Sequence, residues 1–173
     1  MKKVLYILGE LDDDDAEWLA QSGTHRKIPA GEVLIHEGRD IDEVFFVTQG
    51  TFSVSTEGAE QEVARVGAGE VLGEISFVDR HPPTATVTAV ENSGVLSVSR
   101  EALTEKIAAD PAFAGRFYKA VAVFLAERLR STLRQLGSGT LEADTTELDL
   151  TALESVSKAG VRFERILQKL QRS

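Results

Sequence analysis

Residues 69–87 read GEVLGEISFVDRHPPTATV, and this stretch decides how the rest of the chain is interpreted. It begins with a glycine turn that ends in Gly73 and Glu74. Glycine is the residue that takes positive φ at no steric cost, so a tight turn is expected here. A loop leads from Glu74 to Pro83, and the alternating sequence that follows reads as a strand. The stretch therefore predicts a glycine turn, a loop and a β-strand in that order.

The segments around this stretch have a β texture from Thr24 to Ser99. Short runs of apolar and alternating residues are separated by glycine turns, at the spacing typical of a sandwich or barrel. The expected strands are Val33–Ile35, Val44–Val47, Phe52–Ser55, Glu62–Arg65, Ala85–Val90 and Gly94–Val98. The residues alone therefore predict an antiparallel β-barrel or jelly roll.

Helices are expected on both sides of the β region. Residues 11–22 predict a short helix with Asp12 or Asp13 as its cap, because carboxylates favour a helix N-terminus. The acidic run is interpreted as a cap and solvated turn rather than a cation site. Arg100 to Ala109 predicts a second helix, and a long third one runs from Pro111 to about Leu136. Its predicted apolar face holds Phe113, Phe117, Val121, Phe124, Leu125, Leu129, Leu133 and Leu136, and its predicted exposed side holds Glu127, Arg128, Arg130 and Arg134.

The chain is expected to divide into residues 1–137, a polar linker at 138–150, and a terminal helix at 151–173. Thr151 and Glu154 have capping-box spacing, which predicts where that helix begins. Its heptad-like apolar positions predict that it packs against something. Its basic residues Arg162, Arg165, Lys169 and Arg172 are interpreted as a solvated face rather than a DNA-binding surface.

Composition limits the function classes. The chain has 173 residues, a net charge of -9 and a pI near 4.9, which argues against nucleic acid as a partner. There is no cysteine, and the apolar runs are too short to span a bilayer. The three histidines lack metal-ligand spacing, and no nucleophile is paired with a base by motif. The expectation is a cytoplasmic protein that is not an enzyme, with no metal and no membrane partner.

The ordered series of turns and strands over residues 11–137 resembles the cyclic nucleotide-binding domain family. Ile28 to Glu32 and His36 to Gly38 are similar to the family's opening hairpin, and Gly69, Gly73 and Glu74 to the entrance of its phosphate-binding cassette. Ala85-Thr86-Val87 is similar to the strand that leaves the cassette. The resemblance implies the family's jelly-roll fold with flanking helices and a long C-terminal helix. No helix-turn-helix domain is expected after Gly137, because too few residues follow it.

The resemblance also implies a ligand site. The implied ligand-binding residues are Leu72, Gly73, Glu74, Ile75, Ser76, Pro83, Thr84 and Ala85. In the family, Glu74 would accept a hydrogen bond from the ribose, and an arginine at the position of Pro83 would hold the cyclic phosphate. Proline supplies neither a cation nor an N–H group. Arg80 or His81 could substitute or could be solvated loop residues, and Thr132 could contact the purine or be an ordinary exposed threonine.

Two functions from different classes follow. The first is a stand-alone regulatory module that senses a cyclic nucleotide or another small anion, with weak or absent binding of cyclic AMP and cyclic GMP. Apart from that ligand, no cofactor is expected. The second is a ligand-independent module that forms a homodimer, or binds a partner protein, through the apolar C-terminal helices.

Overall fold

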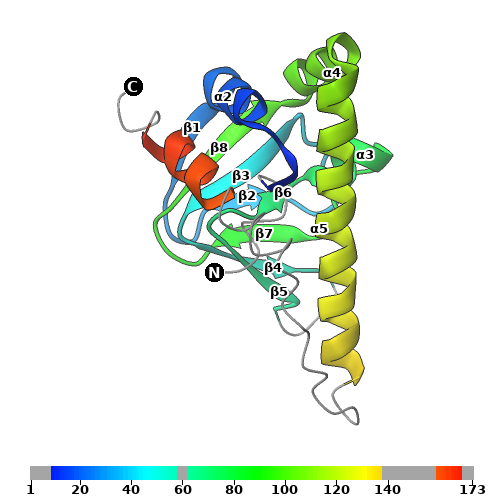
Figure 1. Cartoon of the computed structure of the whole chain (residues 1–173). Coiled ribbons are helices and arrows are strands. Elements are labelled where there is room, and N and C mark those ends of the chain that lie inside the picture. The colour runs from blue at the N-terminus through cyan, green and yellow to red at the C-terminus, as the bar shows by residue number, and fades with distance from the viewer. Residues whose placement is uncertain (1–8, 58–61, 138–158, 169–173) are drawn as a thin grey trace.

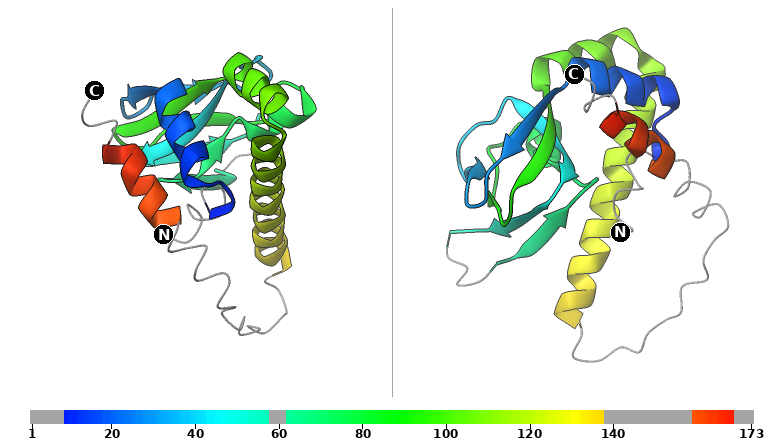
Figure 2. Two further views of the ribbon diagram at one scale, coloured as in Figure 1. Left: turned by 45° about the horizontal axis from the view of Figure 1, so that its top comes forward. Right: turned by 90° about the vertical axis from the view of Figure 1, so that its left-hand side faces the viewer.

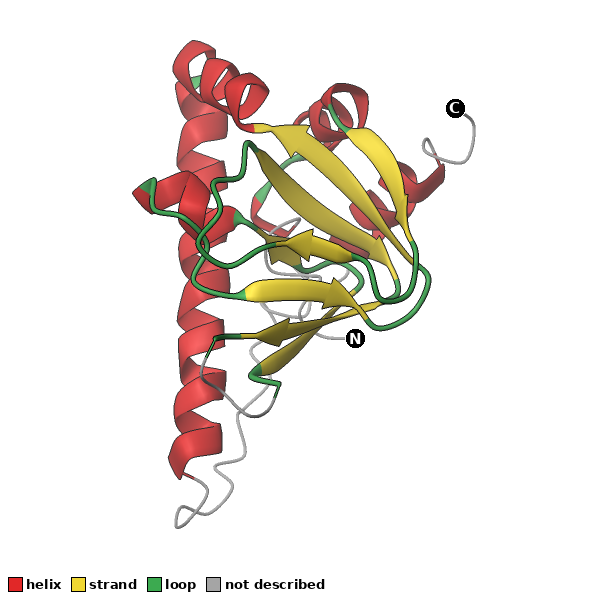
Figure 3. Cartoon of the chain, turned by 180° about the vertical axis from the view of Figure 1, so that it is seen from behind, coloured by secondary structure: helices red, strands yellow, loops and turns green. Residues whose placement is uncertain are grey.

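Two antiparallel four-stranded sheets form the centre of the computed structural model, which describes residues 9–57, 62–137 and 159–168. The first sheet has the order β1-β8-β3-β6 and the second β2-β7-β4-β5. The strands are β1 (Thr24–Ile28), β2 (Val33–Ile35), β3 (Glu43–Gln49), β4 (Thr51–Ser55), β5 (Ala64–Gly67), β6 (Val71–Leu72), β7 (Thr86–Ala89) and β8 (Ser93–Ser99). This antiparallel β-sandwich with flanking helices confirms the predicted fold class (Figure 3).

The helices lie outside the sandwich. They are α2 (Asp13–Ser22), α3 (Glu74–Asp79), α4 (Arg100–Ala109) and α5 (Pro111–Gly137), together with residues 159–168, which we call the terminal helix. Figure 1 shows α5 as a long helix along one edge of both sheets, with α2 and α4 at one end. The views in Figure 2 show the terminal helix beside α2.

The strand predictions were mostly correct in position. The segment predicted at Glu62–Arg65 is shifted, because β5 begins at Ala64 and ends at Gly67. The sequence reading also missed β1 and β6. β6 is only two residues long, and it pairs with β3 through Phe45 and Phe46, so no local period could reveal it.

The helix caps follow the sequence closely. Asp12 and Asp15 form a capping box at the start of α2, and Ser99 accepts a hydrogen bond from the Ala102 N–H at the start of α4. Asp110 accepts from the Phe113 N–H at 2.9 Å, directly before Pro111 opens α5. The predicted linker and the predicted start at Thr151 lie outside the described residues.

The core has two parts. One lies between the sheets and contains the buried residues Phe45, Val47, Phe52 and Val95 with their neighbours. The other lies between the first sheet and the helices, where Phe77 of α3 contacts Phe117 of α5, and Phe117 stacks on Phe113. The second part fixes α3 and α5 relative to the sandwich and so positions the loop at residues 69–87.

Candidate functional site

The predicted ligand-binding residues all come together. Leu72, Gly73, Glu74, Ile75, Ser76, Pro83, Thr84 and Ala85 line one cavity of about 80 Å³, which we call the cassette pocket. The structure adds Ile35, Val54, Asp79, Pro82, Val87 and Arg128 to the wall. The pocket therefore lies between the strand that follows the loop, the short helix α3 and the long helix α5.

Gly73 makes the turn into α3 with φ of +84°, a conformation that L side chains rarely adopt. A Cβ there would lie 2.8 Å from Ile41 Cδ1 and 3.0 Å from the carbonyl oxygen of Glu43. Both the backbone conformation and the space therefore require glycine. The guanidinium of Arg100 fixes the next turn of the chain by donating a hydrogen bond of 2.8 Å to the Ser76 carbonyl.

Glu74 is the first residue of α3, and its side chain is only 2% exposed. Arg128 of α5 donates a hydrogen bond of 3.0 Å from Nη1 to Glu74 Oε1. Burial raises the pKa of Glu74 above its ordinary value of 4.5, and the charge of Arg128 offsets only part of that rise. The floor of the cassette pocket is thus a buried carboxylate with one arginine contact.

Arg128 is the residue that sequence reasoning missed. It was predicted on the exposed side of the long helix, but it lines the cassette pocket, and its side chain is 31% exposed. The signal was present, because Arg128 follows the buried Phe124 by four residues and the buried Val121 by seven. Leu129 and Leu133 of the predicted apolar face are more than half exposed, so the lower part of this face is not covered by the described residues.

The part of the loop that lines the cassette pocket, Pro82 to Ala85, carries no cation. The carbonyl of Pro83 accepts a hydrogen bond of 2.8 Å from the Gly38 N–H, which ties this loop to the turn after β2. Among the described residues that line the cassette pocket, Arg128 is the sole cation, and Glu74 and Asp79 are both acidic. An anion entering the pocket would meet more negative than positive charge.

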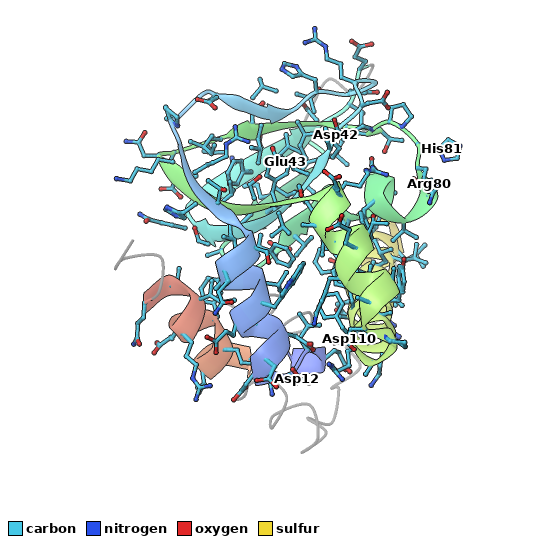
Figure 4. The ribbon with its side chains drawn as sticks, turned by 90° about the horizontal axis from the view of Figure 1, so that it is seen from above. Asp12, Asp42, Glu43, Arg80, His81 and Asp110 are labelled. Carbon is cyan, nitrogen blue, oxygen red and sulfur yellow. The ribbon has the colours of Figure 1, made fainter. Side chains whose placement is uncertain are left out.

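Arg80 and His81 are not among the residues of the cassette pocket wall. Figure 4 shows both side chains at the outer edge of the molecule, beyond the end of α3. The backbone N–H of His81 donates to Asp79 Oδ1 at 3.0 Å, and its ring faces the same carboxylate at 3.5 Å. In this structure, neither residue supplies the missing cation.

A second cavity of about 190 Å³ lies between β4, β5 and α5, and we call it the groove pocket. It shares Val54 and Arg128 with the cassette pocket, so the two are neighbours. Thr132 lines it, and the Thr132 hydroxyl donates to the Arg128 carbonyl at 3.0 Å. Thr132 is exposed and lies in the cavity beside the cassette pocket, an arrangement that fits both sequence interpretations.

The described residues contain no group of three or more His, Cys, Asp or Glu side chains arranged to hold a metal ion. Within the same ranges, no helix is long and apolar enough to cross a membrane. The cassette pocket offers one buried hydrogen-bond acceptor, one arginine and apolar walls, and such groups can bind a ligand.

Residues 25–110 match the cyclic nucleotide-binding domain family. A cyclic AMP receptor protein from Thermus thermophilus is 32% identical over 158 residues, which is 89% of this chain and 64% of that protein. The crystal structure of the N-terminal domain of a transcriptional regulator from Streptomyces coelicolor is 30% identical, with a TM-score of 0.60, over 84% of this chain and 100% of that one. A cyclic nucleotide-binding domain from Methylobacillus flagellatus has a TM-score of 0.72 at 23% identity, over 82% of this chain and 84% of that one.

Some matching proteins are much longer than this chain. The chain spans 20% of the length of three uncharacterized NTE family proteins from mycobacteria, with which it shares 28% identity over 120 residues. The shared unit is therefore only a part of those longer proteins.

Proposed function

Because this chain belongs to the cyclic nucleotide-binding domain family, we propose that it is a regulatory module whose affinity for cyclic AMP and cyclic GMP is weak or absent. The observation that carries the proposal is the composition of the cassette pocket. Its turn and its buried carboxylate are intact, while the position expected to hold the phosphate is Pro83.

The loss of a cation at Pro83 has a definite energetic size. A hydrogen bond to a charged group contributes about 1.5 to 3 kcal/mol. Since 1.4 kcal/mol is a factor of ten, this loss corresponds to roughly one to two decades in affinity. Arg128 does not compensate directly, because its guanidinium already pairs with Glu74.

The pair of Glu74 and Arg128 connects the cassette pocket to α5. A ligand hydroxyl that donates to Glu74 would compete with, or share, the hydrogen bond from Arg128. Arg128 belongs to α5, so ligand contact at Glu74 would alter the position of this helix. This is the route by which we expect binding to reach a partner.

The second candidate function is a ligand-independent interaction module. Leu129 and Leu133 favour it, because they are 60% and 57% exposed and lie four residues apart on α5. Such a pair is suited to a contact with a second copy of this helix or with a partner protein. Light scattering of the wild type and of Leu129→Glu/Leu133→Glu tests it. A dimer that becomes a monomer in the variant supports this function, and a monomeric wild type contradicts its homodimer form.

Titration calorimetry with cyclic AMP and cyclic GMP, at ligand concentrations up to the millimolar range, tests the first function. We expect weak binding or no heat with the wild type, and a weaker signal still with Glu74→Gln. Tight binding by the wild type would contradict the proposal.

A further inference from the structure

The terminal helix lies against α2 and the first sheet, as Figures 1 and 2 show, far along the chain from both. Ala159 and Ile166 on this helix are buried, and Phe163 packs against the same apolar cluster. These residues follow each other at steps of four and three, which is one face of a helix. Phe163 and Ile166 face Leu19, Phe46 and Leu96 across a small cavity. The terminal helix is thus an amphipathic helix seated in a groove.

Two arginines fix its charged side. Arg162 Nε donates to Asp13 Oδ1 at 2.7 Å, and Arg165 Nη1 donates to Asp13 Oδ2 at 2.9 Å, so one carboxylate of α2 receives both. Arg162 also donates to the backbone carbonyls of Gly9 and Leu11. Its side chain is only 13% exposed, so the sequence interpretation of Arg162 as part of a solvated face was wrong.

The groove keeps room beside its occupant. A cavity of about 310 Å³ is lined by the acidic α2 residues Asp13, Asp14 and Glu17 and by Ala16, Ala20, Arg162, Arg165 and Ile166. On the α2 side, this cavity is therefore lined by acidic and apolar side chains. A partner that fits must carry an apolar stripe flanked by arginine or lysine.

Part of the contact that holds the terminal helix is open to solvent. Asp13 and Arg165 are 55% and 61% exposed, and exposed ion pairs contribute little. Because the terminal helix belongs to the same chain, its return to the groove is an intramolecular event, and a partner helix competes with it at a high effective concentration.

We propose that this groove is a docking site for a basic amphipathic helix of a partner protein, and that the terminal helix occupies it in cis until such a helix displaces it. The partner helix carries apolar residues in place of Ala159, Phe163 and Ile166, and basic residues in place of Arg162 and Arg165. The groove contains no residue of the cassette pocket, so the proposal can be tested independently of the proposed ligand binding.

The test uses the full chain and a fluorescein-labelled peptide of residues 157–173. In the variant Arg162→Glu/Arg165→Glu the terminal helix cannot pair with Asp13, and the groove becomes free. We expect fluorescence anisotropy to show the peptide binding this variant about ten-fold or more tightly than the wild type, where the tethered helix competes.

Adding Asp13→Lys to the release variant should clearly weaken peptide binding, because the lysine repels the two arginines of the peptide. Asp40→Lys is the matched control, because it makes the same charge change at an exposed residue that does not line the groove. Binding that survives Asp40→Lys and is weakened by Asp13→Lys supports the proposal. No binding up to 1 mM peptide, or equal loss in both variants, would overturn it.

A second measurement applies if the release variant does not fold. The chain has no cysteine, so spin labels can be placed at exposed Gln21 and Glu164 through introduced cysteines. In the otherwise native chain, excess unlabelled peptide should broaden the single short distance between the labels. A distance that stays unchanged at saturating peptide would overturn the proposal.

Discussion

Glu74 and Asp15 are carboxylates whose side chains are each 2% exposed, and each meets an arginine from α5. At Asp15 the contact is bidentate, because Arg116 donates from Nε at 2.6 Å and from Nη2 at 2.9 Å, and the Asp12 N–H adds a third bond. At Glu74 a single Arg128 nitrogen donates, at 3.0 Å. Burial alone would raise both pKa values, but at Asp15 the bonds from Arg116 and Asp12 prevail and lower it, whereas Glu74 stays raised.

The difference separates a structural ion pair, Asp15 with Arg116, from the proposed ligand site at Glu74. Asp15 has as many donors as a carboxylate needs to remain charged in a buried place. Glu74 accepts fewer hydrogen bonds from arginine, and it lies at the wall of a cavity instead of inside a cap. Such a carboxylate can accept a hydroxyl from a ligand, which is the role that we propose for Glu74.

Breaking the pair of Asp15 and Arg116 should have the largest effect on stability. Arg116→Met leaves Asp15 without its counter-charge, and removal of one partner from a buried pair costs about 3 to 5 kcal/mol. Urea unfolding monitored by circular dichroism measures the loss. Lys119→Met is the control on the same helix, because its pair with Glu10 is largely exposed and should contribute under about 1 kcal/mol. Equal losses of unfolding free energy in Arg116→Met and Lys119→Met would contradict the structural role of the Asp15–Arg116 pair.

Arg128→Met should cost less than Arg116→Met. Glu74 already has a raised pKa, so it can take up a proton when its arginine is removed, which limits the penalty. The same urea series measures both variants. A loss at Arg128 as large as that at Arg116 would show that the two carboxylates do not differ as proposed.

The pH dependence of the free energy of unfolding should have opposite signs at Glu74 and Asp15. We expect this effect to be smaller than those of the two arginine substitutions. Because the pKa of folded Glu74 is raised, the folded state holds its proton above pH 4.5, and this group lowers stability as pH rises from there. Glu74→Gln should therefore gain stability relative to the wild type above pH 4.5. Asp15 has a lowered pKa, so its contribution is present above pH 3.8 and is lost as pH falls below that value.

Asp15→Asn should accordingly lose stability relative to the wild type above pH 3.8. The difference in stability between the two proteins should become smaller as the pH falls. Thermal unfolding from pH 3 to pH 8 measures both variants. If stability relative to the wild type changes with pH in the same direction for both substitutions, the proposed difference between Glu74 and Asp15 is wrong.

Local patterns in the sequence predicted the antiparallel β fold, and the resemblance to the family implied which residues line the cassette pocket. Gly73 and Glu74 lie in one turn, and Pro83 follows soon after the short helix α3, so these residues are close in the sequence as well. The contacts of Arg128 and Arg116 join segments far apart in the chain, and no local pattern sets them. Helix periodicity could have placed Arg128 on the inner face, but its partner could be known only once α5 lay beside α3.

The acidic run at residues 12–15 shows the same limit. As a cap it was predicted correctly, since Asp12 and Asp15 form the capping box. As a solvated turn it was misread, because Asp15 is buried against Arg116 and Asp13 holds the terminal helix. These aspartates also connect two helices that are far apart in the sequence, because Arg116 of α5 pairs with Asp12 and Arg162 of the terminal helix pairs with Asp13.

We propose that the cassette pocket retains its carboxylate and lacks the cation that would hold a cyclic phosphate. Side-by-side calorimetric titration of the wild type and Pro83→Arg with cyclic AMP and cyclic GMP tests this directly. We expect weak or undetectable binding by the wild type and a gain of roughly ten- to a hundred-fold in the variant, the size of one charge-assisted contact. Tight binding by the wild type with no gain in the variant would contradict it, because another cation would then hold the phosphate.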